Sequence, residues 1–167
     1  MNKSVPARTA RVERNTNETQ ILAKLNLDGS GKHQVTTGIS FFDHMLTLFT
    51  AHGLYDLDLK ATGDIEVDYH HTGEDVGLVI GAAINKALGD RKGINRYGSA
   101  VIPMDDALAK VAVDLSNRPY LVFRLPDSMP KESEFDASLA QEFFRALAQR
   151  SGMNLHICVP YGDNWHH

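Results

Sequence analysis

The chain has 167 residues, of which 43% are hydrophobic, enough for one compact domain with a buried core. Its formal net charge of −4, from 17 basic and 21 acidic residues, offers no basic field for nucleic acid. The first residues lack the apolar run of a signal peptide, and no stretch is long enough to cross a bilayer. A lone cysteine, Cys158, excludes an internal disulfide and fits a reducing compartment, so we expect a cytoplasmic protein.

Hydrophobic periodicity predicts strands and helices in alternation. Apolar and polar residues alternate over Thr19–Leu27, which is typical of a half-buried strand, and a turn at 28–31 ends it. Apolar residues at helical spacing over Ile39–His52 predict a helix, with Gly53 as its stop. The other expected elements, in chain order, are strands over 54–60 and 64–69, a helix over 76–88, strands over 107–114 and 120–125, a polar loop over 126–134, a helix over 137–150 and a strand over 154–159.

Two pairs of adjacent histidines are the most unusual feature. His70-His71 is followed by Glu74, and His166-His167 ends the sequence. If a helix begins at residue 70, His70 and Glu74 lie four residues apart on one face. His71 then points about 100° around the helix axis, so it must serve a different ion or a different surface. The pattern predicts two metal centres.

The two halves of the sequence match each other. Ala23–Asp28 resembles Ala109–Asp114 at an offset of 86 residues (109 − 23 = 86), and in each half a helix that carries two adjacent phenylalanines precedes the histidine pair. His44 lies 26 residues before the first pair (70 − 44 = 26), and Glu142 lies 24 residues before the second (166 − 142 = 24). We therefore expect one domain over 1–167, made of two pseudo-twofold half-domains over about 10–90 and 91–167.

Each half therefore offers a helix residue and a histidine pair as possible metal ligands. Imidazole and carboxylate groups without cysteine suit Mn²⁺, Fe²⁺ or Zn²⁺ rather than a thiolate-rich structural zinc site. Other histidines have simpler interpretations, since His33 in a turn is solvated and His156 in an apolar strand fits the core. The alternative for His166-His167 is the start of an affinity tag.

Several ordered motifs extend this pattern. They are Thr16–Thr19, Gly38–Leu46, Asp68–Asp75, Arg96–Gly98, Pro103–Asp105, Asp114–Pro119, Leu155–Ile157 and Tyr161–His167. With these motifs the chain resembles the imidazoleglycerol-phosphate dehydratase family from about Arg11 to the last residue. The resemblance implies an α/β (α+β) fold of the ribosomal protein S5 domain 2-like type, an internally duplicated half-domain with helices packed between two mainly antiparallel four-stranded sheets.

The same resemblance implies a function. The family is a group of hydro-lyases of histidine biosynthesis, which remove water from imidazole glycerol phosphate to give imidazole acetol phosphate. It implies two Mn²⁺ ions per active site and a small phosphate substrate, with no nucleic-acid or membrane partner. It also implies a homo-oligomer of 24 subunits with active sites between subunits.

Residue by residue, the resemblance implies three sets of functional side chains. The metal sites would be formed by His44, His70, His71, Glu74, Glu142, His166 and His167. The substrate would be bound by Glu18, His44, His52, His70, Arg96 and Arg118, where the arginine forks suit a phosphate dianion. Catalysis would use Glu18, His71 and Glu74. A surface salt bridge is the alternative for either arginine.

The reaction itself explains the use of two metal ions. The proton to be lost does not lie next to a carbonyl, so simple enolate formation is not possible. A metal ion at each imidazole nitrogen would stabilise the imidazolate, which could expel the adjacent hydroxyl to give a diazafulvene-like intermediate. Loss of the neighbouring C–H proton then gives an enol that becomes the ketone. Glu18 is the expected general acid/base for both proton transfers.

The sequence departs from the family pattern in a few places. Leu48 stands where a glutamine is common and cannot make the polar contact expected there, Asn117 stands in place of a glycine, and Gly73 in place of a valine. The family continues past the second histidine pair to a glutamate and a phosphate-contacting lysine, so we expect a C-terminal tail missing from view, with a truncated protein as the alternative. A metal-dependent hydrolase and a metal-binding shell protein are the alternative functions.

Overall fold

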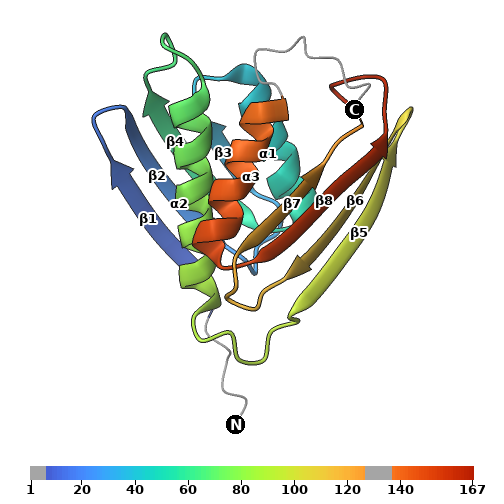
Figure 1. Cartoon of the computed structure of the whole chain (residues 1–167). Coiled ribbons are helices and arrows are strands. Elements are labelled where there is room, and N and C mark those ends of the chain that lie inside the picture. Colours follow the sequence, from blue (N-terminus) through green and yellow to red (C-terminus); the bar gives the residue numbers. More distant parts are fainter. Residues whose placement is uncertain (1–6, 127–136) are drawn as a thin grey trace.

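The computed structural model describes residues 7–126 and 137–167, which form two sheets with helices between them (Figure 1). The strands of the first sheet are β1 (Thr9–Asn15), β2 (Thr19–Asn26), β3 (His33–Thr36) and β4 (Asp56–Gly63). Those of the second are β5 (Tyr97–Met104), β6 (Ala107–Asp114), β7 (Tyr120–Arg124) and β8 (Asn154–Tyr161). The helices are α1 (Ser40–Gly53), α2 (His70–Leu88) and α3 (Ala137–Ser151). None of the described helices is long and apolar enough to span a membrane.

The two sheets have the same construction, which confirms the expected fold class with its internal duplication. The strand orders are β1-β2-β4-β3 and β5-β6-β8-β7, and in each sheet only the last pair is parallel. The limits of β2 and β6 differ by 88 residues (107 − 19 = 88), two more than the offset of 86 expected from the sequence.

Equivalent hairpins open the two sheets. In the first, Asn15 pairs with Gln20 and the Thr16 N–H donates to the Thr19 carbonyl oxygen, leaving residues 17 and 18 at the tip. In the second, Met104 pairs with Ala107, leaving residues 105 and 106 at the tip. Glu18 and Asp106 are therefore equivalent, each the second residue of a two-residue turn.

The core lies where the helix layer meets the sheets. β2 buries every second residue, as its alternating sequence predicts, and this face packs on the apolar side of α2. α2 and α3 run side by side in the same direction, because Gly77 contacts Phe143 and Gly81 contacts Leu147. A Cβ at residue 77 would lie 2.5 Å from the Phe143 carbonyl oxygen, so a glycine is required for this close approach.

Two sequence predictions are wrong in the connection between β4 and α2. Residues 64–69 form turns rather than a strand, because the Asp64 N–H bonds the Glu18 carbonyl oxygen and the Val67 N–H bonds that of Asp64. The following helix begins at His70, six residues before the start expected at 76, and β1, β3 and β5 are additional strands. Most of the polar loop expected over 126–134 lies outside the described residues.

The second sheet leaves apolar surface uncovered. All eight residues of β5 are exposed. An apolar hollow of about 360 Å³ lies between α1, α3 and the β5–β6 hairpin, and its wall includes Phe41, Met45, Met104 and His166. The hollow therefore borders the second histidine pair.

Candidate active site

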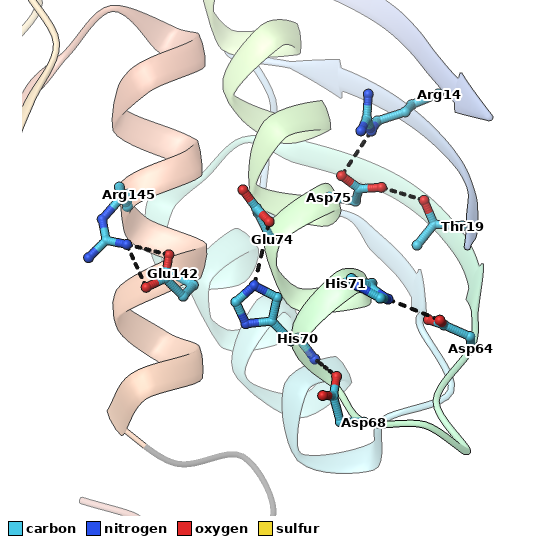
Figure 2. A network of polar contacts seen from close by, with 10 residues as sticks. All are labelled: Arg14, Thr19, Asp64, Asp68, His70, His71, Glu74, Asp75, Glu142 and Arg145. Atoms are coloured by element: carbon cyan, nitrogen blue, oxygen red, sulfur yellow. Dashed lines mark hydrogen bonds and ion pairs between the residues drawn. The ribbon is translucent and has the colours of Figure 1, made fainter. Parts of the chain in front are cut away.

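The first histidine pair lies at the amino end of α2, where its two rings diverge (Figure 2). Nε2 of His70 lies 3.6 Å from Oε2 of Glu74 one helical turn away, so these side chains share one face as their spacing predicts. Nδ1 of His71 lies 2.9 Å from Oδ2 of Asp64, and the two histidine ring centroids are 6.1 Å apart. His70 and His71 therefore face different partners.

Glu18 lies near the same end of α2, in the turn between β1 and β2. Its carbonyl oxygen accepts the Asp64 N–H at 3.2 Å, which ties this turn to the residue that contacts His71. The pKa of His71 is raised, first by the hydrogen bond to Asp64 and then by the negative charges of Asp64, Glu18 and Asp68. No hydrogen bond or ion pair within residues 7–126 and 137–167 uses the Glu18 carboxylate.

A buried carboxylate joins the β1–β2 turn to α2. Asp75 accepts a hydrogen bond from the Thr19 hydroxyl at 2.5 Å and forms an ion pair with Arg14 at 2.9 Å (Figure 2). Thr19 is the residue after Glu18, and Asp75 the residue after Glu74. This contact therefore fixes the relative positions of the Glu18 and Glu74 backbones.

The second histidine pair forms a separate cluster with the start of α1. The rings of His44 and His166 are stacked with centroids 5.7 Å apart, and Phe41 meets His166 edge-on at 5.8 Å. His167 turns the other way, and its Nδ1 lies 2.5 Å from Oδ1 of Asp106. A helix residue from one half of the chain thus lies beside a histidine pair from the other half.

Glu142 is placed on α3 beside the part of α2 that carries His70 and Glu74, as Figure 2 shows. Its carboxylate accepts two hydrogen bonds of 2.5 Å from Arg145 on its own helix. His52 lies exposed in the last turn of α1, eight residues beyond His44. At 1.5 Å per residue, their Cα atoms are roughly 12 Å apart along the helix axis.

The two candidate phosphate ligands, Arg96 and Arg118, lie at the end of the second sheet opposite to the turn that carries Asp106. Arg96 donates two hydrogen bonds to Asp114, at 2.6 and 3.0 Å, and lowers the pKa of that carboxyl group. Arg118 is exposed nearby, and its charge also lowers the pKa of Asp114. Asp114, at the end of β6, lies eight residues from Asp106, which immediately precedes this strand; this is roughly 27 Å at a strand rise of about 3.4 Å.

Within one chain, the candidate ligands come together in pairs. No group of three histidine, cysteine, aspartate or glutamate side chains in the described part of the chain is arranged to hold a metal ion. The donors that do meet, His70 with Glu74 and His44 with His166, are imidazole and carboxylate groups of the kind that suit Mn²⁺. The donor chemistry therefore fits the expected ion, although no more than two of these donors meet within the described residues.

Comparison with known proteins gives the family. The family model for imidazoleglycerol-phosphate dehydratase matches residues 37–167. The enzyme of that name from Desulfosudis oleivorans is 59% identical over 160 residues, which cover 96% of this chain and 82% of the relative. The one from Acetivibrio thermocellus is 55% identical over 156 residues, 93% of this chain and 80% of the relative. The chain belongs to the imidazoleglycerol-phosphate dehydratase family.

Solved structures from the dehydratase family agree with the fold. The Staphylococcus aureus dehydratase superposes with a TM-score of 0.83 at 38% identity, covering 95% of this chain and 88% of that one. The Pyrococcus furiosus enzyme gives 0.81 at 36% identity, covering 93% and 83%. The chain is accordingly a hydro-lyase of histidine biosynthesis.

Backbone conformation explains one of the three departures from the dehydratase pattern, the asparagine at residue 117. Asn117 has a φ of +60°, a left-handed conformation that asparagine adopts more readily than most residues, so it can replace the usual glycine. Gly73 is buried in the first turn of α2. Leu48 is 37% exposed on α1, and its side chain supplies no polar atom there.

Three aspartates of this site were missed by sequence reasoning. Asp64, Asp75 and Asp106 contact His71, Thr19 and His167. The partners lie 7, 56 and 61 residues away in sequence. Only Asp64 gave a local signal, as a carboxylate one residue after β4 and shortly before the histidine pair.

Proposed function

We propose that this chain converts imidazole glycerol phosphate to imidazole acetol phosphate and water, with Mn²⁺ as the metal ion. The observation that carries the proposal is the group of side chains at the amino end of α2. His70 lies beside Glu74 there, and the negative charge of Glu18 contributes to the raised pKa of His71. Imidazole and carboxylate metal ligands thus lie next to a carboxylate that is not engaged in another described contact.

The proposed ligands are His44, His70, His71, Glu74, Glu142, His166 and His167. Bound Mn²⁺ would act as a Lewis acid on the imidazole nitrogen atoms of the substrate. Glu142 would first have to leave Arg145, whose two hydrogen bonds now occupy both of its oxygens. His52 and the Arg96 and Arg118 guanidinium groups would bind the remainder of the substrate, with the arginines at its phosphate.

Glu18 is the proposed proton-transfer residue. The reaction removes the hydroxyl group next to the imidazole and a proton from the adjacent carbon, and the resulting enol becomes the ketone. Glu18 gives a proton to the departing hydroxyl group, which leaves as water, and takes the proton from carbon. Its exposed side chain, at the tip of a two-residue turn, is accessible to such a substrate.

The site is proposed to form between copies of the chain. Two observations support an assembly, for which the family resemblance suggests 24 subunits. Among the described residues the proposed metal ligands of one chain meet only in pairs, and Asp114, which Arg96 contacts, lies roughly 27 Å from Asp106. A small substrate cannot reach both regions of one chain, so one copy would supply histidines and another arginines.

A cytoplasmic location, suggested by the lone Cys158, is part of the same proposal.

The proposal is tested by turnover of imidazole glycerol phosphate after removal of metal with a chelator. Mass spectrometry should detect water loss only after Mn²⁺ is added back. Phosphate release would instead indicate a hydrolase, and Mn²⁺ binding without turnover would indicate a metal-binding shell protein.

The role of Glu18 is tested by Glu18→Gln, which should lower kcat by about 10²–10⁴-fold, the usual range for loss of an acid/base group. Glu13→Gln is the matched control, since Glu13 is exposed on β1 and bonds Arg11 and Asn15. Near-full turnover by Glu18→Gln with unchanged metal content would disprove this role.

A further inference from the structure

The second histidine of each pair is held by an aspartate through the same ring nitrogen. Nδ1 of His71 contacts Asp64 at 2.9 Å, and Nδ1 of His167 contacts Asp106 at 2.5 Å. An ionised carboxylate can only accept a hydrogen bond, so Nδ1 must carry the proton in both rings. In the neutral ring Nε2 then keeps its lone pair, which is available to a cation. In His167 this nitrogen lies 3.7 Å from Oδ2 of Asp105, beyond hydrogen-bond distance.

The backbone before each pair is also built alike. Oδ1 of Asp68 accepts the His70 N–H at 2.7 Å, and Oδ1 of Asn164 accepts the His166 N–H at 2.9 Å. In each case the acceptor lies two residues before the first histidine. The arrangement therefore recurs in both halves of the chain.

The two aspartates come from different elements. Asp64 follows β4, immediately before the turns that lead to α2, whereas Asp106 lies in the turn between β5 and β6. By hairpin position the counterpart of Asp106 is Glu18, and not Asp64. Aspartates from two non-equivalent positions thus make the same contact with the second histidine of each pair. A chance contact in one half would not explain why this contact recurs in the other half.

Asp106 is fixed by more than its histidine. Its Oδ2 accepts the backbone N–H groups of Asp163 and Asn164, at 2.6 and 2.9 Å. Gly162 packs against the neighbouring Ala107, where a Cβ on the glycine would lie 3.0 Å from the alanine Cβ. The side chains of Asp106 and His167 are only 31% and 20% exposed. One carboxylate thus orders both the backbone before the histidine pair and the ring of its second member.

We propose that Asp106 and Asp64 are positioning residues, which hold His167 and His71 in the Nδ1–H form and direct each Nε2 toward a divalent cation. The inference rests on the proposed function, because it assigns both histidines to metal binding. Histidine ligands of metal ions commonly donate their other ring N–H to a carboxylate, and loss of that partner typically costs about 10–100-fold in affinity or activity.

The test uses the full chain and two readouts. Long-range ¹H–¹⁵N correlation spectra of the metal-free protein, at a pH where the rings are neutral, report the tautomer of each histidine. In Asp106→Ala, His167 should lose its Nδ1–H preference while His71 keeps it, and the Kd for Mn²⁺ should rise about 10–100-fold. Asp64→Ala should affect His71 and spare His167. Asp90→Ala is the control, since Asp90 is exposed and pairs with Lys92.

An unchanged His167 tautomer in folded Asp106→Ala, or an equal response of both histidines to either variant, would overturn the proposal. If Asp106→Ala does not fold, Asp106→Asn replaces it, since it keeps an acceptor oxygen without the charge. Asp106→Asn should preserve the tautomer and weaken Mn²⁺ binding less than 10-fold, and loss of the tautomer would count against the proposal. Failure of the wild-type chain to bind Mn²⁺ would refute the proposed metal, while the metal-free spectra would still decide the role of the aspartates.

Discussion

The hydrogen bond between Thr19 and Asp75 should contribute measurably to stability, because both residues are almost completely buried. Thr19 is 2% exposed and Asp75 7% exposed, and the hydroxyl donates to a charged acceptor. Hydrogen bonds to charged groups contribute about 1.5–3 kcal/mol. The ion pair with Arg14, whose side chain is 41% exposed, adds under about 1 kcal/mol after solvent screening. Asp75→Ala should therefore lower the free energy of unfolding by about 2–4 kcal/mol.

A double-mutant cycle isolates the hydrogen bond from the other effects of these changes. Thr19→Val, Asp75→Ala and the double variant are compared with wild type by urea unfolding, and the coupling energy should reach about 1.5 kcal/mol. Thr50→Val is the matched control, since the Thr50 side chain is equally buried but donates to the neutral carbonyl of Leu46. Its cost should be about 1 kcal/mol. A Thr19–Asp75 coupling below about 0.5 kcal/mol would refute the reasoning.

Two further predictions concern helix packing and acid stability. Gly77→Ala should destabilise the fold by about 1–2 kcal/mol, since a Cβ 2.5 Å from the Phe143 carbonyl oxygen must push α2 and α3 apart by roughly 1 Å. Gly98→Ala, where the added Cβ meets nothing within 4 Å, should change the unfolding free energy little, and an equal loss in both variants would contradict this explanation. The Arg8 hydrogen bond lowers the Asp28 pKa from 3.8 to about 2, so its stabilisation is present above about pH 4 and is lost as pH falls through 2. Acid unfolding followed by circular dichroism should show a shallower loss of stability over this window in Arg8→Ala, and an unchanged slope would exclude Asp28 as a contributor.

All the central strands of the two sheets were predicted from the sequence, whereas β7 is the one edge strand of the described residues that was predicted. β6 was predicted with its observed limits, and β2 to within one residue, and both are central strands. In β2 the alternating sequence reflects one buried face. The three missed strands, β1, β3 and β5, are all edge strands. β5 is exposed along its whole length, so no difference in burial between its faces imposes an alternating pattern. Segment 64–69 gave the opposite error, because Ile65 and Val67 alternate with polar residues although Val67 is 69% exposed in a turn.

The predictability of the candidate site follows the sequence distance between partners. His70 and Glu74 could be paired from helix geometry alone, because one turn of helix fixes their relation. The contact between His44 and His166 joins residues 122 positions apart (166 − 44 = 122), and the repeat showed only that each belongs to a ligand set. Asp106 could not be assigned to His167 without the turn between β5 and β6, since nothing local distinguishes it from Asp105.

The equivalence of Glu18 and Asp106 suggests how one ancestral unit could acquire chemistry without losing its architecture. In the second half of the chain, the hairpin acid is occupied with His167 and two backbone N–H groups. In the first half, Asp64 contacts His71, and the hairpin acid Glu18 is not used for this contact. After a gene segment has been duplicated, one copy can keep the structural role while the other copy acquires a different function. A carboxylate that makes no such contact can evolve toward proton transfer, whereas its counterpart remains tied to His167 and to the backbone before the histidine pair.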